Sequence, residues 1–207
     1  MVKKRLRTID LTMAAVFVAL MAVGANMTSF LVIGGVPITL QTFFSILAGA
    51  ILGSRVGALA MIAYVLIGIA GAPVFAQFTG GAAIFIKPTF GFLLSYILVS
   101  FLVGLFIEKS EKKSVGIFIS ASLIGMVVNY VIGTNWMYYA YKLWAEAPEG
   151  FTYKLAWSWM MVPLPKDIIL SIFAGIIAPR LYRAVHKTNP ITKETIASNE
   201  ISNTTKS

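Results

Sequence analysis

The sequence predicts an all-α integral membrane protein built from about six transmembrane helices. Three observations predict this class. Hydrophobic residues make up 58% of the 207 residues and charged residues only 12%, about half the charged fraction of a typical soluble domain. The mean hydropathy is +0.83. Long apolar runs recur along the chain, as expected where a hydrocarbon core about 30 Å thick requires roughly 20 apolar residues per span.

Six apolar runs give the predicted helices and their order. They cover residues 9–30, 38–52, 56–70, 90–107, 115–140 and 165–177. A basic segment, residues 1–8, precedes the first run. The second and third runs are short for full spans and are joined by a tight polar turn at residues 53–55, so we expect a tilted hairpin buried within the bundle. The sixth helix is expected to stop near Pro179, because proline interrupts a helix.

Three stretches outside these runs differ in character. Residues 71–90, the predicted outer loop, are rich in glycine, proline and threonine. Irregular backbone near a membrane occurs only where protein buries it or where it lines a cavity, so this loop is a candidate site. Residues 141–163 form an aromatic connector, expected to lie along the membrane interface. Residues 188–207 are polar and are predicted to be a disordered cytoplasmic tail after a single transmembrane domain, residues 1–187.

Basic residues collect on one predicted side of the membrane. With a cytoplasmic N-terminus, 13 of the 17 lysines and arginines lie in inner segments or in the C-terminal tail. Only Lys87, Lys142, Lys154 and Lys166 lie in outer segments. This bias follows the positive-inside rule and predicts that both termini are cytoplasmic. The net charge of +9 therefore reports topology and gives no support to nucleic-acid binding.

Three ionisable residues, Lys87, Lys166 and Asp167, fall in the predicted outer half of the membrane. Ionisable groups at membrane depth cost at least about 2.5–3.5 kcal/mol and usually face a polar cavity. Asp167 follows Pro163 and Pro165, so its carboxylate either complements the dipole of the last helix, contributing about 0.3–1 kcal/mol, or contacts a ligand. Lys166 either reaches the interface along its apolar stem or joins the site. Lys87 lies in the irregular loop and is a candidate functional residue.

Uncharged polar residues interrupt the apolar helices as well. They are Gln41, Asn129, Thr134 and Asn135. Each either forms an interhelical hydrogen bond or contacts a ligand. Ala15 and Ala19 form a pair of small residues one turn apart on the first helix. Such spacing permits close helix approach, either within the chain or against a partner.

Several classes of chemistry find no support in the sequence. The chain has no cysteine and one histidine, which excludes disulfides and thiolate or multi-histidine metal sites. It has no G-x-x-x-x-G-K-[ST] loop for ATP, and no H-E-x-x-H or G-x-S-x-G motif. We therefore expect neither an enzyme nor a resident cofactor.

A series of short motifs resembles the BioY family, whose members are substrate-binding S components of energy-coupling factor (ECF) transporters. The motifs are GVPITLQT (35–42), GAILG (49–53), GAPVFA (71–76), TGG (79–81), PTFGF (88–92), YVIGTNW (130–136) and PKD (165–167). Each motif is weak alone. Together they occur in the family's order over roughly residues 10–183, and this order makes the resemblance specific.

The resemblance implies a six-helix S-component fold in a bacterial cell membrane, with a biotin pocket near the outer face. It also implies a transmembrane coupling subunit and two ATPase subunits as partners, which agrees with the missing ATP-binding loop. Ala15 and Ala19 are similar to the family's first-helix motif that contacts the coupling subunit.

The resemblance further implies which residues bind biotin. Asp167 suits the two ureido N–H groups, and Lys87 suits the carboxylate. Asn129, Gln41 or Lys166 can answer the ureido carbonyl. The remaining expected contacts are the apolar walls Phe75, Tyr130 and Trp136, and the polar loop positions Thr79, Gly80 and Gly81.

Two departures from the family pattern affect this site. Lys87 stands where the family commonly has glycine before Pro-Thr. On the last helix the family commonly has a lysine one turn after the aspartate, whereas here Leu170 occupies that position and Lys166 precedes Asp167. Other readings stay open: an S component for another vitamin or a biotin precursor, a stand-alone secondary transporter or channel, and an intramembrane enzyme using Lys166 and Asp167 as acid and base.

Overall fold

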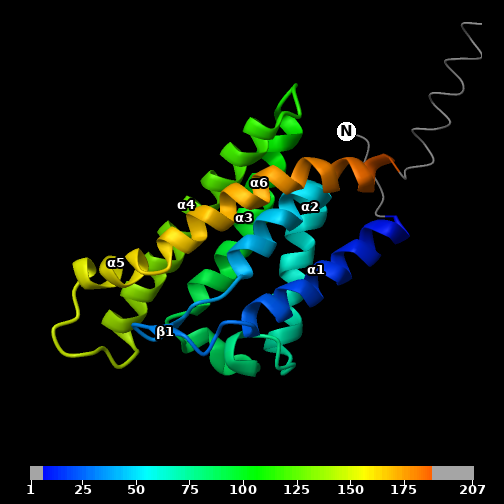
Figure 1. Cartoon of the computed structure of the whole chain (residues 1–207). Helices are drawn as coiled ribbons and strands as arrows, with labels where there is room; N and C mark the ends of the chain where they lie inside the picture. The colour runs from blue at the N-terminus through cyan, green and yellow to red at the C-terminus, as the bar shows by residue number, and fades with distance from the viewer. Residues whose placement is uncertain (1–6, 188–207) are drawn as a thin grey trace, which may run out of the picture.

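Five helices in the computed structural model, which describes residues 7–187, are long and apolar enough to cross a membrane (Figure 1). They are α1 (Thr8–Asn26), α2 (Gln41–Ile69), α3 (Phe90–Lys109), α4 (Val115–Leu143) and α6 (Leu164–Lys187). The shorter elements are β1 (Val32–Ile33), β2 (Val36–Pro37), the 3₁₀ helices η1 (Ala76–Phe78) and η2 (Ala82–Ile86), and α5 (Tyr153–Met161). The predicted tail and most of the basic N-terminal segment lie outside the described residues.

Helix α2 folds back on itself at Gly53. Gly53 has φ 83° and ψ 174°, a backbone region that essentially only glycine adopts. The Gln41 side chain donates a hydrogen bond to the Tyr64 hydroxyl at 2.9 Å, whereas residues this far apart in a straight helix would be separated by about 35 Å. The two halves of α2 therefore form the hairpin predicted from the sequence, and the chain has six crossing segments.

The hairpin turn is fastened to the end of α3. The Ser54 backbone N–H and hydroxyl donate to the Glu108 carboxylate at 2.8 and 2.7 Å. Glycine lets the backbones approach closely here: a Cβ atom at Gly49 would meet the backbone of Ser100, and one at Gly104 would meet that of Ser54. Small residues therefore set the distance between α2 and α3, as is common in membrane bundles.

The core lies where α2, α3 and α4 meet, and α1 and α6 cover it. Its largest fully buried side chains include Met21, Ile46, Met61, Val103 and Phe118. Exposed apolar side chains cover the outside of the helices, as expected for surfaces that face lipid. The all-α membrane architecture predicted from composition is thus confirmed.

The last helix does not stop at Pro179 as the sequence predicted, but continues to Lys187. Proline removes one backbone hydrogen bond, yet packing against α4 holds the helix together on both sides of it. Ala174 and Ala178 are fully buried, and Tyr182 packs edge-on against Phe118 with ring centroids 5.8 Å apart. Tertiary contacts here outweigh the local preference of the sequence.

The irregular elements gather at one end of the bundle (Figure 1). Strands β1 and β2 pair antiparallel and lie there with the loop that carries η1 and η2. In the orientation predicted by the positive-inside rule this is the outer end, and the turns at Gly53 and at 110–114 lie at the inner end. The outer end is where a cavity opens.

Gly53→Ala should destabilise the protein by about 1–3 kcal/mol, because alanine cannot adopt the fold-back conformation without strain and its Cβ would meet Glu108. Thermal unfolding of the detergent-purified protein measures the effect as a melting temperature lowered by several degrees. Gly116→Ala is the matched control, since the nearest atom to a Cβ at Gly116 would be the Ser114 hydroxyl oxygen, 3.9 Å away. Equal melting temperatures for both variants would contradict the proposed strain.

Candidate ligand-binding site

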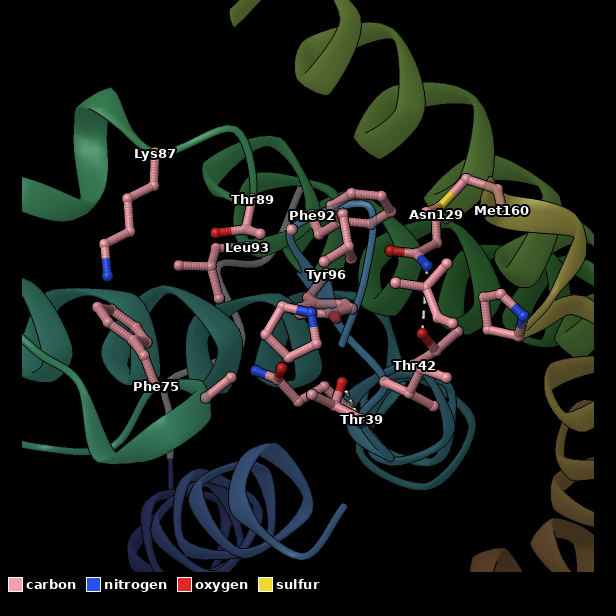
Figure 2. Close-up of a pocket in the computed structure, with 18 of the residues that line it drawn as sticks. Thr39, Thr42, Phe75, Lys87, Thr89, Phe92, Leu93, Tyr96, Asn129 and Met160 are labelled. Atoms are coloured by element: carbon pink, nitrogen blue, oxygen red, sulfur yellow. Dashed lines mark hydrogen bonds between the residues drawn. The ribbon is translucent and has the colours of Figure 1, made fainter. Parts of the chain in front are cut away.

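A cavity of about 130 Å³ lies at the outer end of the bundle. Its volume is about ten times the space that one buried water requires, so it can accommodate a small organic molecule. It is lined by residues of the β1–β2 hairpin, the start of α2, the loop that carries η1 and η2, and helices α3, α4, α5 and α6. Figure 2 shows several of these side chains converging from different elements.

Eight of the residues predicted from the sequence to contact ligand line this cavity. They are Gln41, Phe75, Thr79, Lys87, Asn129, Tyr130, Lys166 and Asp167. Segments more than 120 residues apart in the chain supply them, so the fold brings together groups that the sequence could only mark one by one. Their contact with a ligand remains a prediction.

Three predicted residues are not among the residues that line the cavity. Trp136 lies between α3 and α4 and packs edge-on against Phe90, with ring centroids 5.5 Å apart. Its side chain occupies the space that a Cβ atom at Gly91 would fill. Gly80 lies against the Ala72 carbonyl. Gly81 has φ 94° and helps to close the loop, because its N–H donates to the Gly68 carbonyl at 2.7 Å.

Among the polar residues that line the cavity is Asp167. Its carboxylate lies on the first turn of α6, and the residue is only 6% exposed. The Tyr130 hydroxyl donates to one of its oxygens at 2.7 Å, and the Lys166 amine lies 2.8 Å from the other. Lys166 also donates to the Thr39 carbonyl at 2.6 Å. Each carboxylate oxygen has two lone pairs, so Asp167 retains acceptor capacity toward the cavity.

Two amide side chains line the same cavity. Asn129 of α4 donates to the Thr42 hydroxyl at 3.2 Å and accepts from the Ser95 hydroxyl at 2.6 Å, so it ties α4 to α2 and α3. Gln41 donates to Tyr64 at 2.9 Å, and the Tyr64 hydroxyl continues to the Val74 carbonyl at 2.8 Å. Both side chains thus hold helical segments together through hydrogen bonds and also line the cavity.

Lys87 lies at the opposite end of the cavity from Asn129 and Met160, as Figure 2 shows. Its amine extends from the loop before α3 toward the side of the cavity where Phe75 lies. Among the described residues no hydrogen bond or ion pair is recorded for this amine. The cavity therefore has a cluster of hydrogen-bonding groups at one end and a cation at the other.

Several residues of the wall carry no signal that the sequence could give. Tyr96 and Met160 are buried and line the cavity, but tyrosine and methionine are ordinary in membrane helices. Thr39 and Thr42 do fall within the 35–42 motif, which could have marked them. Of the other polar helix residues, Asn135 bonds the Val131 carbonyl of its own helix at 2.7 Å and lies outside the cavity.

A helical membrane bundle that encloses a polar cavity at its outer end defines a membrane-embedded protein that binds small molecules. The chain belongs to the BioY family, whose family model matches residues 1–187. The family resemblance seen in the sequence is therefore confirmed, and it places the chain among membrane transport proteins rather than enzymes.

Curated relatives and one solved structure agree with this placement. The chain is 44% identical over 201 residues to the "Putative biotin transporter BioYB" of Bacillus subtilis, covering 96% of this chain and 100% of that protein. It is 36% identical over 173 residues to the "Biotin transporter BioY" of Thermotoga maritima, covering 83% and 95%. The fold is similar, with a TM-score of 0.74 and 24% identity over 84% of this chain and 90% of the other, to the crystal structure of the S-component for biotin from an ECF-type ABC transporter.

Proposed function

We propose that this protein is the biotin-binding subunit of an ECF-type vitamin importer, and that it captures biotin at the outer face of the bacterial cytoplasmic membrane. One observation carries the proposal: a buried carboxylate, Asp167, and the Lys87 amine line the same cavity, and Lys87 lies at the end opposite Asn129. The names of the curated relatives support biotin as the substrate. The proposal requires no resident cofactor or metal.

The polar end of the cavity complements the ureido ring of biotin. A ureido group has two N–H donors and one carbonyl acceptor, so it needs an acceptor and a donor side by side. Asp167 supplies the acceptor oxygens. Asn129, Gln41 and Lys166 supply N–H donors within the same wall. In a low-dielectric site such charge-assisted bonds are stronger than neutral ones.

The rest of the cavity matches the apolar and acidic parts of the ligand. Phe75, Phe92, Leu93 and Met160 are buried and give apolar walls for the thioether ring. The chain of the ligand then runs toward Lys87, which pairs with its carboxylate. This orientation gives Lys87, which stands where the family commonly has glycine, a role at the acidic end of the ligand.

The small-residue pair on α1 supports a docking face for the coupling subunit. Ala15 and Ala19 are both exposed on the surface of the bundle, where a partner helix can approach closely. Two ATPase subunits would then supply the hydrolysis for which this sequence has no motif. An S component for another vitamin, a biotin precursor as substrate, and a stand-alone secondary transporter are the alternative outcomes of the tests below.

Equilibrium binding of labelled biotin to detergent-purified protein, without partners, tests the proposal directly. Wild-type protein should bind, and Asp167→Ala should bind on the order of 10- to 100-fold more weakly, because a charged hydrogen-bond acceptor is lost. Glu149→Ala, which removes an exposed carboxylate outside the cavity, should bind as wild type does. Unchanged affinity of Asp167→Ala would remove that residue from the site, and failure of wild type to bind would reject biotin.

Lys87→Gln should weaken the binding of biotin about three- to tenfold while leaving the binding of biotin methyl ester unchanged, because the ester has no charge for Lys87 to pair with. Competition against labelled biotin measures both ligands on one protein. Lys154→Gln, an exposed outer lysine away from the cavity, is the control. An equal loss for acid and ester would place the carboxylate elsewhere.

Ala15→Leu combined with Ala19→Leu should abolish co-purification of the coupling subunit and ATPase subunits, because two large side chains prevent close helix approach. Biotin binding by the isolated protein should not change. Ser120→Leu places a similar bulk on an exposed position of α4 and should leave the complex intact. Retention of the complex by the double variant would show that the partner docks on another face.

A further inference from the structure

The outer end of α1 is hydrogen-bonded to two separate segments of the cavity wall. Asn26, the last residue of α1, and Thr28 and Ser29, which directly follow the helix, make these bonds through their side chains, and none of the three lines the cavity. We refer to these three residues as the clamp. Figure 1 shows this end of α1 beside the loop between α2 and α3.

The first bonded segment leads into α2. The Thr28 hydroxyl donates to the Ile38 carbonyl at 2.7 Å, and the Leu40 N–H donates to the Gly24 carbonyl of α1 at 2.8 Å. Ile38 and Thr39 line the cavity, and the Thr39 carbonyl accepts from Lys166. The end of α1 thus fixes the backbone that holds the amine beside Asp167.

The second bonded segment is η1, whose backbone is strained. Gln77 and Phe78 have φ 60° and 53°, left-handed values that side-chain-bearing residues rarely adopt. The Ser29 hydroxyl accepts the Gln77 N–H at 3.2 Å, and the Asn26 side-chain carbonyl accepts the Phe78 N–H at 2.7 Å. The two bonds therefore stabilise a conformation that these residues would not keep alone.

The clamp is itself well anchored. The Asn26 amide nitrogen donates to the Ala22 carbonyl at 2.9 Å, which aims its oxygen at η1. Ser29 is 4% exposed. On either side of the strained pair, Phe75, Gln77 and Thr79 line the cavity, and the Phe75 N–H closes the loop on the Thr79 carbonyl at 2.9 Å.

We infer that Asn26, Thr28 and Ser29 are positioning residues for ligand retention: without touching the ligand, they hold the loop wall of the cavity closed over it. Loss of a clamp bond lets η1 relax toward ordinary backbone angles, so the wall opens more often and a bound ligand leaves sooner. The choice of biotin as ligand rests on the function proposed above. The closure itself does not depend on the identity of the ligand.

Dissociation of labelled biotin from the detergent-purified full chain tests the clamp. Asn26→Ala and Ser29→Ala should each release biotin about three- to tenfold faster, the effect of one lost hydrogen bond. Thr12→Val is the control, since the Thr12 hydroxyl bonds only within the inner end of α1, to Thr8 at 3.1 Å.

A second measurement needs no ligand. Because the chain has no cysteine, Ile84→Cys introduces a single thiol at a buried position of the cavity wall. A water-soluble maleimide should label it several-fold faster when Asn26→Ala or Ser29→Ala is added. If Asn26→Ala does not fold, Ser29→Ala decides both measurements.

The outcomes separate the two proposals. Release and labelling rates equal to wild type in the folded alanine variants would overturn the clamp. If wild-type protein fails to bind biotin, the proposed function is rejected, and the labelling rates still decide whether the clamp closes the cavity.

Discussion

Hydrocarbon cannot hydrogen-bond a backbone amide, and the whole molecule is arranged around that constraint. Regular helices satisfy their own backbone groups across the membrane. The two stretches that cannot do so, before and after α2, lie at the outer end, where side chains at and just beyond the end of α1 accept from or donate to them. These bonds support strained loop residues and a polar cavity beside lipid.

The buried Asp167 carboxylate has the strictest requirement for partners. A buried charge is stable only when it is paired and hydrogen-bonded, and Lys166 and Tyr130 meet this need from α6 and α4. Lys166 in turn is tied to the Thr39 carbonyl. The same contacts that stabilise the charge thus fix three parts of the cavity wall relative to one another.

Hydropathy predicted the six crossings, because each span must be apolar, and the polar turn at 53–55 marked the hairpin. The rule that proline interrupts a helix misplaced the end of α6, since the packing of Ala178 and Tyr182 is invisible in the sequence. Charged and amide residues in apolar runs marked most of the polar wall. Trp136 was assigned to the wall but lies two helical turns, about 10 Å, beyond Asn129 along α4: a sequence indicates the face of a helix more readily than the depth of a side chain.

The fold-back at Gly53 limits how far the first half of α2 extends across the membrane. The half of α2 from Gln41 to the turn rises only about 18 Å, against a hydrocarbon thickness of about 30 Å. With the turn at the inner boundary, Gln41 stands roughly 10 Å below the outer one. A molecule seated against it has therefore already passed about a third of the way across the hydrocarbon, and about 18 Å remain between it and the inner boundary.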